Sequence, residues 1–137
     1  MTDYKKQGRL NRAHGAAFEL RTRKEFEKIG WIVTKWHNNV DLQTDEITQA
    51  KNHYIPGRGL TMGKGFPDFL MFREKEVNEG GSLYQLMFVE CKLNNKLCKE
   101  EKQKMQVLKN LGYNCFVAYE KDKCMIFRRF EGYEDKS

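Results

Sequence analysis

The sequence predicts an α/β fold in which a mixed central sheet is flanked by helices. Two segments have helical composition and five apolar segments have strand composition, in the order α, β, β, β, α, β, β. The chain has 137 residues, 39% of them hydrophobic, which is enough for one core and one domain. We expect this domain to cover residues 12–130, between a loose basic arm at 1–11 and a tail at 131–137.

Residues 12–29 have the composition of a helix, and Gly30 is a suitable stop. The apolar residues fall on two nearly opposite sides, so we expect more than one partner to pack against this helix. Glu19 precedes Arg23 by four residues, and this spacing taken alone favours an exposed ion pair worth about 0.3–0.5 kcal/mol. The two apolar sides are formed by Ala13, Ala16, Ala17 and Leu20, and by Phe18, Phe26 and Ile29.

Residues 31–36 are rich in aromatic and β-branched side chains and indicate a strand. The next segment, 37–54, is polar, and we expect a short helix at 44–51. A loop at 56–65 then carries four glycines and the cations Arg58 and Lys64. It lacks the glycine–lysine spacing of a P-loop, and a strand follows it instead of a helix. The loop is either a phosphate-binding segment or a plain connection.

Two adjacent strands are predicted at residues 66–72 and 83–92, joined by a turn at 79–82. The second strand is apolar on both faces until its last residues, which indicates a central position in the sheet. Since side chains alternate along a strand, Glu90 and Lys92 must point to the same face as Phe88.

The remainder of the chain predicts one helix and two strands. Residues 96–111 form the helix, which Gly112 ends and which faces the core with Met105, Leu108 and Leu111. The strands are expected at residues 114–119 and 124–130, with a turn at 121–122.

Asp68, Glu90 and Lys92 form a group of charges where a sheet is normally apolar. Glu90 and Lys92 could neutralise each other, but Asp68 then remains as an additional carboxylate nearby. Two carboxylates about 4 Å apart repel by roughly 4 kcal/mol at an effective dielectric constant of 20. A divalent cation removes this conflict, and hard oxygen ligands suit Mg²⁺ or Mn²⁺. Lys92 beside the cation would help to activate water and offset charge on a phosphate, which are the parts needed to hydrolyse a phosphodiester.

The formal net charge of +6 is unevenly distributed along the chain. Residues 1–36 hold nine Lys and Arg against four acids, and residues 91–112 hold six against two. Residues 73–90, in contrast, hold two cations against four acids. Two basic blocks around an acidic centre fit a polyanionic ligand held near a metal site, although basic surfaces also serve solubility alone.

The four cysteines show neither a CxxC pair nor a zinc-finger spacing with the three histidines, so structural zinc is not expected. Cys91, Cys115 and Cys124 fall in apolar runs and are predicted to be core thiols. No signal peptide, membrane-spanning segment or lipidation motif is evident. We therefore expect a cytoplasmic, reducing environment and no membrane partner.

The motif Pro67-Asp68, followed by Glu90-Cys91-Lys92, resembles the signature of the PD-(D/E)XK nuclease superfamily. The segment from Gly15 to Glu19, followed by Gly30-Trp31, resembles the first helix of archaeal Holliday-junction resolvases. The segment from Gly65 to Asp68 and the helix beginning near Leu97 also resemble the VRR-NUC branch. Together these likenesses extend from about Gly15 to Tyr119, and they imply a restriction-endonuclease-like αβββαβ core.

The resemblance also implies roles for particular residues. Glu19, Asp68, Glu90 and the carbonyl group of Cys91 are the implied metal ligands, and Lys92 is the implied catalytic lysine. A glutamine on the second helix contacts the site in many relatives, and Gln103 is the candidate here. Its spacing is imperfect because the glutamine usually follows the leucine more closely, and Gln106 is the other option.

Binding to DNA is expected through the phosphates, without reading of the base sequence. Tyr4, Trp36 and Tyr54 are each either stacking platforms for unpaired bases or packing residues. Relatives of this size often form homodimers, which suits a junction with two strands to cut. The phosphate-binding candidates are Arg9, Arg12, Arg21, Arg58, Lys64, Lys96 and Lys99.

These observations lead to one main hypothesis and two alternatives. The main hypothesis is a Mg²⁺-dependent endodeoxyribonuclease, with Mn²⁺ as a substitute, that selects branched or otherwise structured DNA. One alternative is a non-catalytic nucleic-acid-binding domain on the same fold. The other is a restriction-like enzyme that reads sequence, which is disfavoured because the chain is short for a separate reading module.

Overall fold

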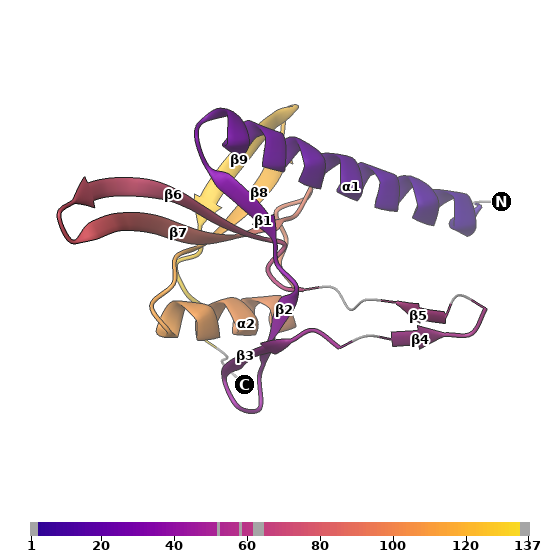
Figure 1. Cartoon of the computed structure of the whole chain (residues 1–137). Coiled ribbons are helices and arrows are strands. Elements are labelled where there is room, and N and C mark those ends of the chain that lie inside the picture. The colour runs from indigo at the N-terminus through magenta and orange to yellow at the C-terminus, as the bar shows by residue number, and fades with distance from the viewer. Residues whose placement is uncertain (1–2, 52, 58, 62–64, 135–137) are drawn as a thin grey trace.

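The computed structural model describes residues 3–51, 53–57, 59–61 and 65–134, and it has the predicted α/β class (Figure 1). Five strands form the main sheet in the order β1-β6-β7-β8-β9. The β7–β8 pair is parallel and the other neighbours are antiparallel, so the sheet is mixed, as predicted. The strands are β1 (Ile32–Lys35), β6 (Phe69–Asn78), β7 (Gly81–Cys91), β8 (Cys115–Lys121) and β9 (Cys124–Arg129).

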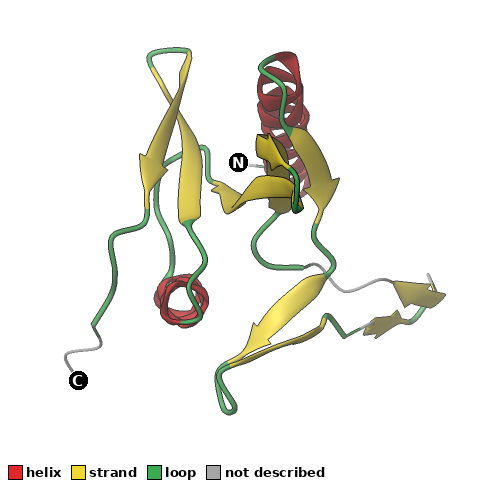
Figure 2. Cartoon of the chain, turned by 60° about the vertical axis from the view of Figure 1, so that its left-hand side comes forward, coloured by secondary structure: helices red, strands yellow, loops and turns green. Residues whose placement is uncertain are grey.

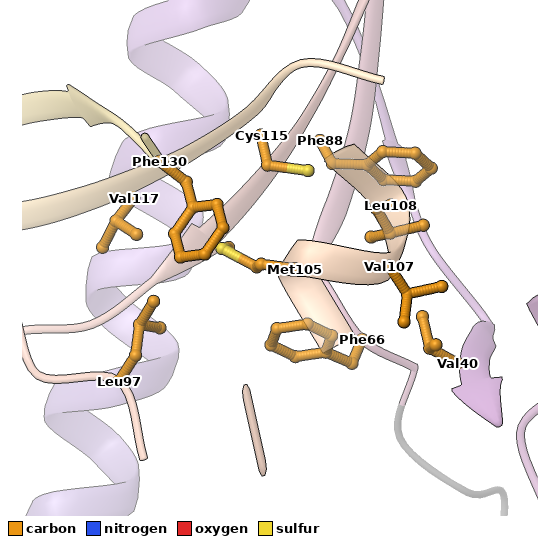
Figure 3. Close-up of a cluster of buried hydrophobic side chains, with 10 residues drawn as sticks. All are labelled: Val40, Phe66, Phe88, Leu97, Met105, Val107, Leu108, Cys115, Val117 and Phe130. Carbon is orange, nitrogen blue, oxygen red and sulfur yellow. The ribbon is translucent and has the colours of Figure 1, made fainter. Parts of the chain in front are cut away.

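The two helices cover opposite faces of the sheet, because β7 presents apolar side chains on both. Met87 and Val89 point to the face covered by α1 (Tyr4–Lys28), where they pack in one cluster with Phe18 of that helix. Phe88 points to the other face, covered by α2 (Lys99–Asn110). This second cluster is drawn in Figure 3. The predicted central position of this strand is confirmed.

The helix α1 begins at Tyr4, so the prediction of a loose arm over residues 1–11 is wrong for 4–11. Asp3 caps this helix, since its side chain accepts a hydrogen bond from the Lys6 N–H at 3.1 Å. Only Phe18, Thr22 and Phe26 are buried, and the opposite apolar side is exposed. The prediction of packing on two sides is therefore wrong for the described chain, and the first half of α1 extends beyond the sheet (Figure 1).

Two small hairpins lie between β1 and β6. The first stands where a helix was predicted at 44–51, so that prediction is wrong, and the second extends into the loop predicted at 56–65. The first consists of β2 (Asn38–Asp41) and β3 (Glu46–Gln49), and the second of β4 (His53–Ile55) and β5 (Gly59–Thr61). Asp45 adopts a positive φ of 56° and donates its N–H to the Asp41 carbonyl, which closes the first turn. Val40 and Ile47 pair across this hairpin and pack against the α2 side of the core. Figure 2 shows the hairpins, in yellow, extending away from the main sheet.

Two smaller differences from the predictions concern the second half of the chain. Leu111 is 53% exposed, so it does not belong to the buried stripe of Met105 and Leu108. Cys124 is exposed and is not a core thiol, whereas Cys115 is buried as predicted.

Within the described part of the chain, neither helix has an apolar stretch long enough to cross a lipid bilayer.

Gly65 provides a test of how tightly the chain is packed just before β6. A Cβ atom at this position would lie 1.9 Å from the Trp36 carbonyl oxygen, so backbone would have to move. We predict that Gly65→Ala lowers the free energy of unfolding by about 1–3 kcal/mol in a denaturant titration. Gly15→Ala is the matched control, because nothing lies within 4 Å of its Cβ position. Helix propensity should make that variant about 1 kcal/mol more stable, and equal effects would contradict the packing at Gly65.

Candidate active site

A cavity of about 660 Å³ opens between the middle of α1 and the ends of β1 and β7. The segment preceding β6 and the first turn of α2 complete its wall. All five residues implied as metal ligands or catalytic lysine contribute to this cavity. The lining is formed by Arg12, Gly15, Ala16, Glu19, Lys35, Gly65, Phe66, Asp68, Glu90, Cys91, Lys92 and Glu101.

Asp68 is placed by the close contact of its segment with the end of β1. The Phe66 N–H donates to the Asn38 carbonyl at 2.9 Å, and the Trp36 N–H donates to the Asp68 carbonyl at 3.0 Å. The Phe66–Pro67 peptide bond is cis. The two hydrogen bonds, with the absence of a side chain at Gly65, fix Asp68 immediately before β6 and beside the end of β7.

Asp68 and Glu90 are linked reciprocally through the backbone. The Asp68 N–H donates to Glu90 Oε1 at 3.1 Å, and the Cys91 N–H donates to Asp68 Oδ2 at 2.8 Å. Each carboxylate thus accepts a hydrogen bond from the backbone of the other segment, which holds both at one end of the sheet. Glu90 is only 5% exposed, so one of the two carboxyl groups is buried.

Burial determines the ionisation of the site. Burial, together with the neighbouring carboxyl groups of Asp68 and Glu101, raises the pKa of Glu90 to about 11. Glu90 is therefore protonated at neutral pH unless a cation offsets the negative charge around it. Burial also raises the pKa of the Cys91 thiol, so this thiol stays neutral and does not act as a nucleophile.

Two site residues, Glu101 and Lys35, were missed at the sequence level. Lys92 Nζ lies 2.6 Å from Glu101 Oε2, and Lys35 Nζ lies 2.9 Å from Glu19 Oε2. Burial lowers the pKa of Lys92, but the hydrogen bond to Glu101 and the negative charges of the neighbouring carboxyl groups together outweigh burial, so the net pKa is raised. The predicted exposed pair of Glu19 with Arg23 is wrong, because Glu19 pairs with Lys35 and Arg23 pairs with Glu27.

The sequence contained a signal for Glu101 in its spacing. Glu101 follows Cys98 by three residues and accepts the Cys98 N–H at 2.9 Å, as the N3 glutamate of a capping box does. Along the sequence, Glu101 also lies closer to Leu97 than Gln103 does. The resemblance was imperfect at Gln103 because the expected residue follows the leucine more closely. Lys35 carried no comparable signal, because a lysine at the end of a short strand is ordinary.

Neither glutamine that was considered on α2 lines the cavity. Residues two apart on a helix point about 200° apart, so Gln103 faces away from Glu101 and lines a separate hollow. Gln106 accepts the Tyr133 N–H at 2.7 Å and donates to Asn110 at 2.8 Å. Gln103, the predicted catalytic glutamine, is therefore not brought to this cavity, and the α2 residue that lines it is Glu101.

The predicted phosphate-binding cations divide between the two sides of α1 and the start of α2. Arg12 lines the cavity, and Arg9 lies one turn before it. Arg21 does not line the cavity, and it binds Glu120 at 3.1 Å and the Lys123 carbonyl at 3.0 Å. Lys96 and Lys99 are exposed outside the cavity. Arg58 and Lys64 lie outside the described residues.

The aromatic candidates for base stacking also differ in their surroundings. Trp36 packs edge-to-face on Phe88, with 5.1 Å between ring centroids, so it is a partly buried packing residue at the edge of the core. Tyr4 is 83% exposed at the start of α1 and stays a candidate. The side chain of Tyr54 lies outside the part of the chain that the structure describes.

The donor chemistry of the cavity fits a divalent cation, although the side chains are not gathered around one. In the described ranges, no three His, Cys, Asp or Glu side chains are positioned together as metal ligands. Glu19 and Glu101 are turned towards lysines instead. Asp68, Glu90 and the Cys91 carbonyl nevertheless offer hard oxygen atoms beside a buried carboxyl group. Binding of a metal by Glu19 would require it to leave Lys35.

Comparison of the chain with protein-family models, with curated proteins and with solved structures found no match. The linked carboxyl groups of Asp68 and Glu90, the second of them buried, share the cavity with Lys92 and with Arg12 of α1. Such a set can bind a cation and a negatively charged substrate together.

The buried Glu90 carboxyl group should make stability depend on pH in EDTA. The native carboxyl group keeps its proton, whereas the unfolded one loses it above about pH 4.5. Its contribution to stability is therefore full below pH 4.5 and is lost as the pH rises towards the native pKa. We predict that Glu90→Gln removes a fall of at most about 1.4 kcal/mol per pH unit between pH 5 and pH 8.

Chemical denaturation across this pH range measures the effect. Glu100→Gln is the matched control, because that side chain is 66% exposed on the same turn of α2 as Glu101. An unchanged pH slope in Glu90→Gln would contradict the assigned ionisation of the site.

Proposed function

We propose that the chain is a divalent-metal-dependent nuclease that hydrolyses phosphodiester bonds in DNA. The observation that carries this proposal is the reciprocal backbone link of Asp68 and Glu90 in a cavity shared with Lys92. Glu19 and Arg12 of α1 face the same cavity. Hydrolysis of a phosphodiester needs a site that accepts both a cation and a phosphate, and this set of residues provides for both.

Each residue has a distinct part in this proposal. Asp68, Glu90 and the Cys91 carbonyl hold Mg²⁺ or Mn²⁺, with Glu19 as a further ligand once it leaves Lys35. The chemistry that the bound ion supplies is the activation of water as a nucleophile. Lys92 offsets the charge that develops on the phosphate, and Glu101 positions its ammonium group until the substrate arrives. Arg12 holds a phosphate of the DNA at the mouth of the cavity.

The finer fold and substrate assignments belong to the same proposal. The order of α1, β1, β6, β7, α2 and β8 supports a restriction-endonuclease-like core, with β2–β5 as an insertion between β1 and β6. The resemblance to junction resolvases and VRR-NUC nucleases supports structured DNA as the substrate. Homodimer formation and a cytoplasmic location stay predictions of the sequence.

One observation favours the alternative of a non-catalytic nucleic-acid-binding domain. Both lysines of the cavity are engaged by carboxylates, Lys92 by Glu101 and Lys35 by Glu19. If these ion pairs persisted with DNA and metal present, the cavity would bind but not cut. Cleavage assays therefore decide between the two functions.

Supercoiled plasmid and branched DNA, each incubated with Mg²⁺ or with EDTA, test the proposal. We predict Mg²⁺-dependent cleavage by the wild-type chain and at least a 1,000-fold loss in Asp68→Asn, on the order expected for removal of a metal ligand. DNA binding by Asp68→Asn should change little. Asp122→Asn, in the exposed β8–β9 turn, is the matched control and should cleave normally. Binding without cleavage in both Mg²⁺ and Mn²⁺ would overturn the proposal.

Metal binding can be measured without any substrate. For a dissociation constant of about 1 mM, about 10 mM Mg²⁺ stabilises the native state by roughly 1.4 kcal/mol. We predict that the Tm of the wild-type chain then rises by about 3–5 °C. The rise should be absent from Asp68→Asn and present in Glu100→Gln. Equal shifts in all three proteins would place the cation elsewhere.

A further inference from the structure

The first half of α1, residues 4–17, carries cations that the folded chain does not use. It contains Lys5, Lys6, Arg9 and Arg12 and no Asp or Glu. Apart from Gly8 and Gly15, every residue in this half is exposed. Among the residues that the structure describes, no ion pair involves Lys5, Arg9 or Arg12. A surface with one sign of charge and no internal partner is typical of a polyanion-binding site.

Three of these cations lie along α1 next to the candidate active site. Lys5, Arg9 and Arg12 are spaced by four and three residues, so they lie along one side of the helix. Arg12 lines both the active-site cavity and a second hollow of about 370 Å³ along α1. Lys5 and Arg9 line the second hollow. The basic side of α1 is therefore continuous with the cavity that holds Glu19 and Asp68.

The spacing of these cations along α1 determines which phosphates of a bound DNA strand they would contact. At 1.5 Å per residue, Arg12 lies about 10 Å and Lys5 about 21 Å along the axis from Glu19. One strand of duplex DNA rises about 3.4 Å per nucleotide. A strand running along α1 would therefore meet these cations about three to six nucleotides from the bond at the metal site.

We propose that Lys5, Arg9 and Arg12 form a substrate arm that binds backbone phosphates about three to six nucleotides to one side of the cleaved bond. This inference rests on the proposed nuclease function and specifies its substrate. The DNA must continue past the cut on the α1 side, so cleavage occurs within a strand and not at its last nucleotides. The other reading, that these cations only keep the helix solvated, requires no contact with DNA.

A salt titration of DNA binding tests the arm without cleavage. Each phosphate contact on duplex DNA contributes about 0.9 to the slope of log K against log salt concentration. In the Asp68→Asn background, replacing Lys5, Arg9 and Arg12 by Gln should reduce this slope by about 2–3. A control with Lys24, Lys75 and Lys121 replaced by Gln changes the net charge equally at exposed positions elsewhere. Equal slopes in the two triple variants would overturn the arm, and circular dichroism checks that both fold.

Cleavage of shortened duplexes tests the one-sided footprint. The wild-type chain should lose at least about tenfold in kcat/KM when the duplex on one side of the cut is shortened below about six nucleotides, with little effect on the other side. The arm variant should be insensitive to this shortening. Equal sensitivity on both sides would contradict the arm. A wild-type chain that cleaves nothing but shows the slope difference would refute the nuclease function and retain the arm as a binding surface.

Discussion

The site depends on one pair of hydrogen bonds, in which Asp68 and Glu90 each accept a backbone N–H from the other's segment. These bonds hold two carboxyl groups at the end of a central strand, where the hydrophobic core would otherwise exclude charge. The arrangement is electrostatically costly on its own, because Glu90 is buried beside Asp68 and Glu101. Protonation of Glu90 relieves this repulsion, whereas a bound cation would turn it into attraction.

The rest of the fold supports that pair from three directions. Gly65 lets the segment before β6 approach β1 closely enough to place Asp68. The strand β7 lies between β6 and β8 and is packed on both faces, so its end is held in place. The two helices then bring one acidic side chain each, Glu19 from α1 and Glu101 from α2, and both pair with lysines.

The sequence predicted the parts that depend on short-range rules. Strand alternation placed Glu90 and Lys92 on one face, and both line the same cavity as Asp68. The sequence could not predict which residue of α2 enters the site, because that depends on how the helix is rotated about its axis. The hairpins between β1 and β6 were missed because their polar sequence has little strand character, and the first is stabilised by the packing of Val40 and Ile47 against the core.

The central claim is that Asp68 and Glu90 form a cation site. Anomalous scattering from crystals soaked in Mn²⁺ tests it most directly, because it locates the ion without assuming any activity. The account predicts one strong peak within about 2.0–2.3 Å of a carboxylate oxygen of each residue, with the Cys91 carbonyl as a further ligand. A cavity without a peak at Mn²⁺ concentrations that occupy other sites, with Lys92 still bound to Glu101, would contradict it.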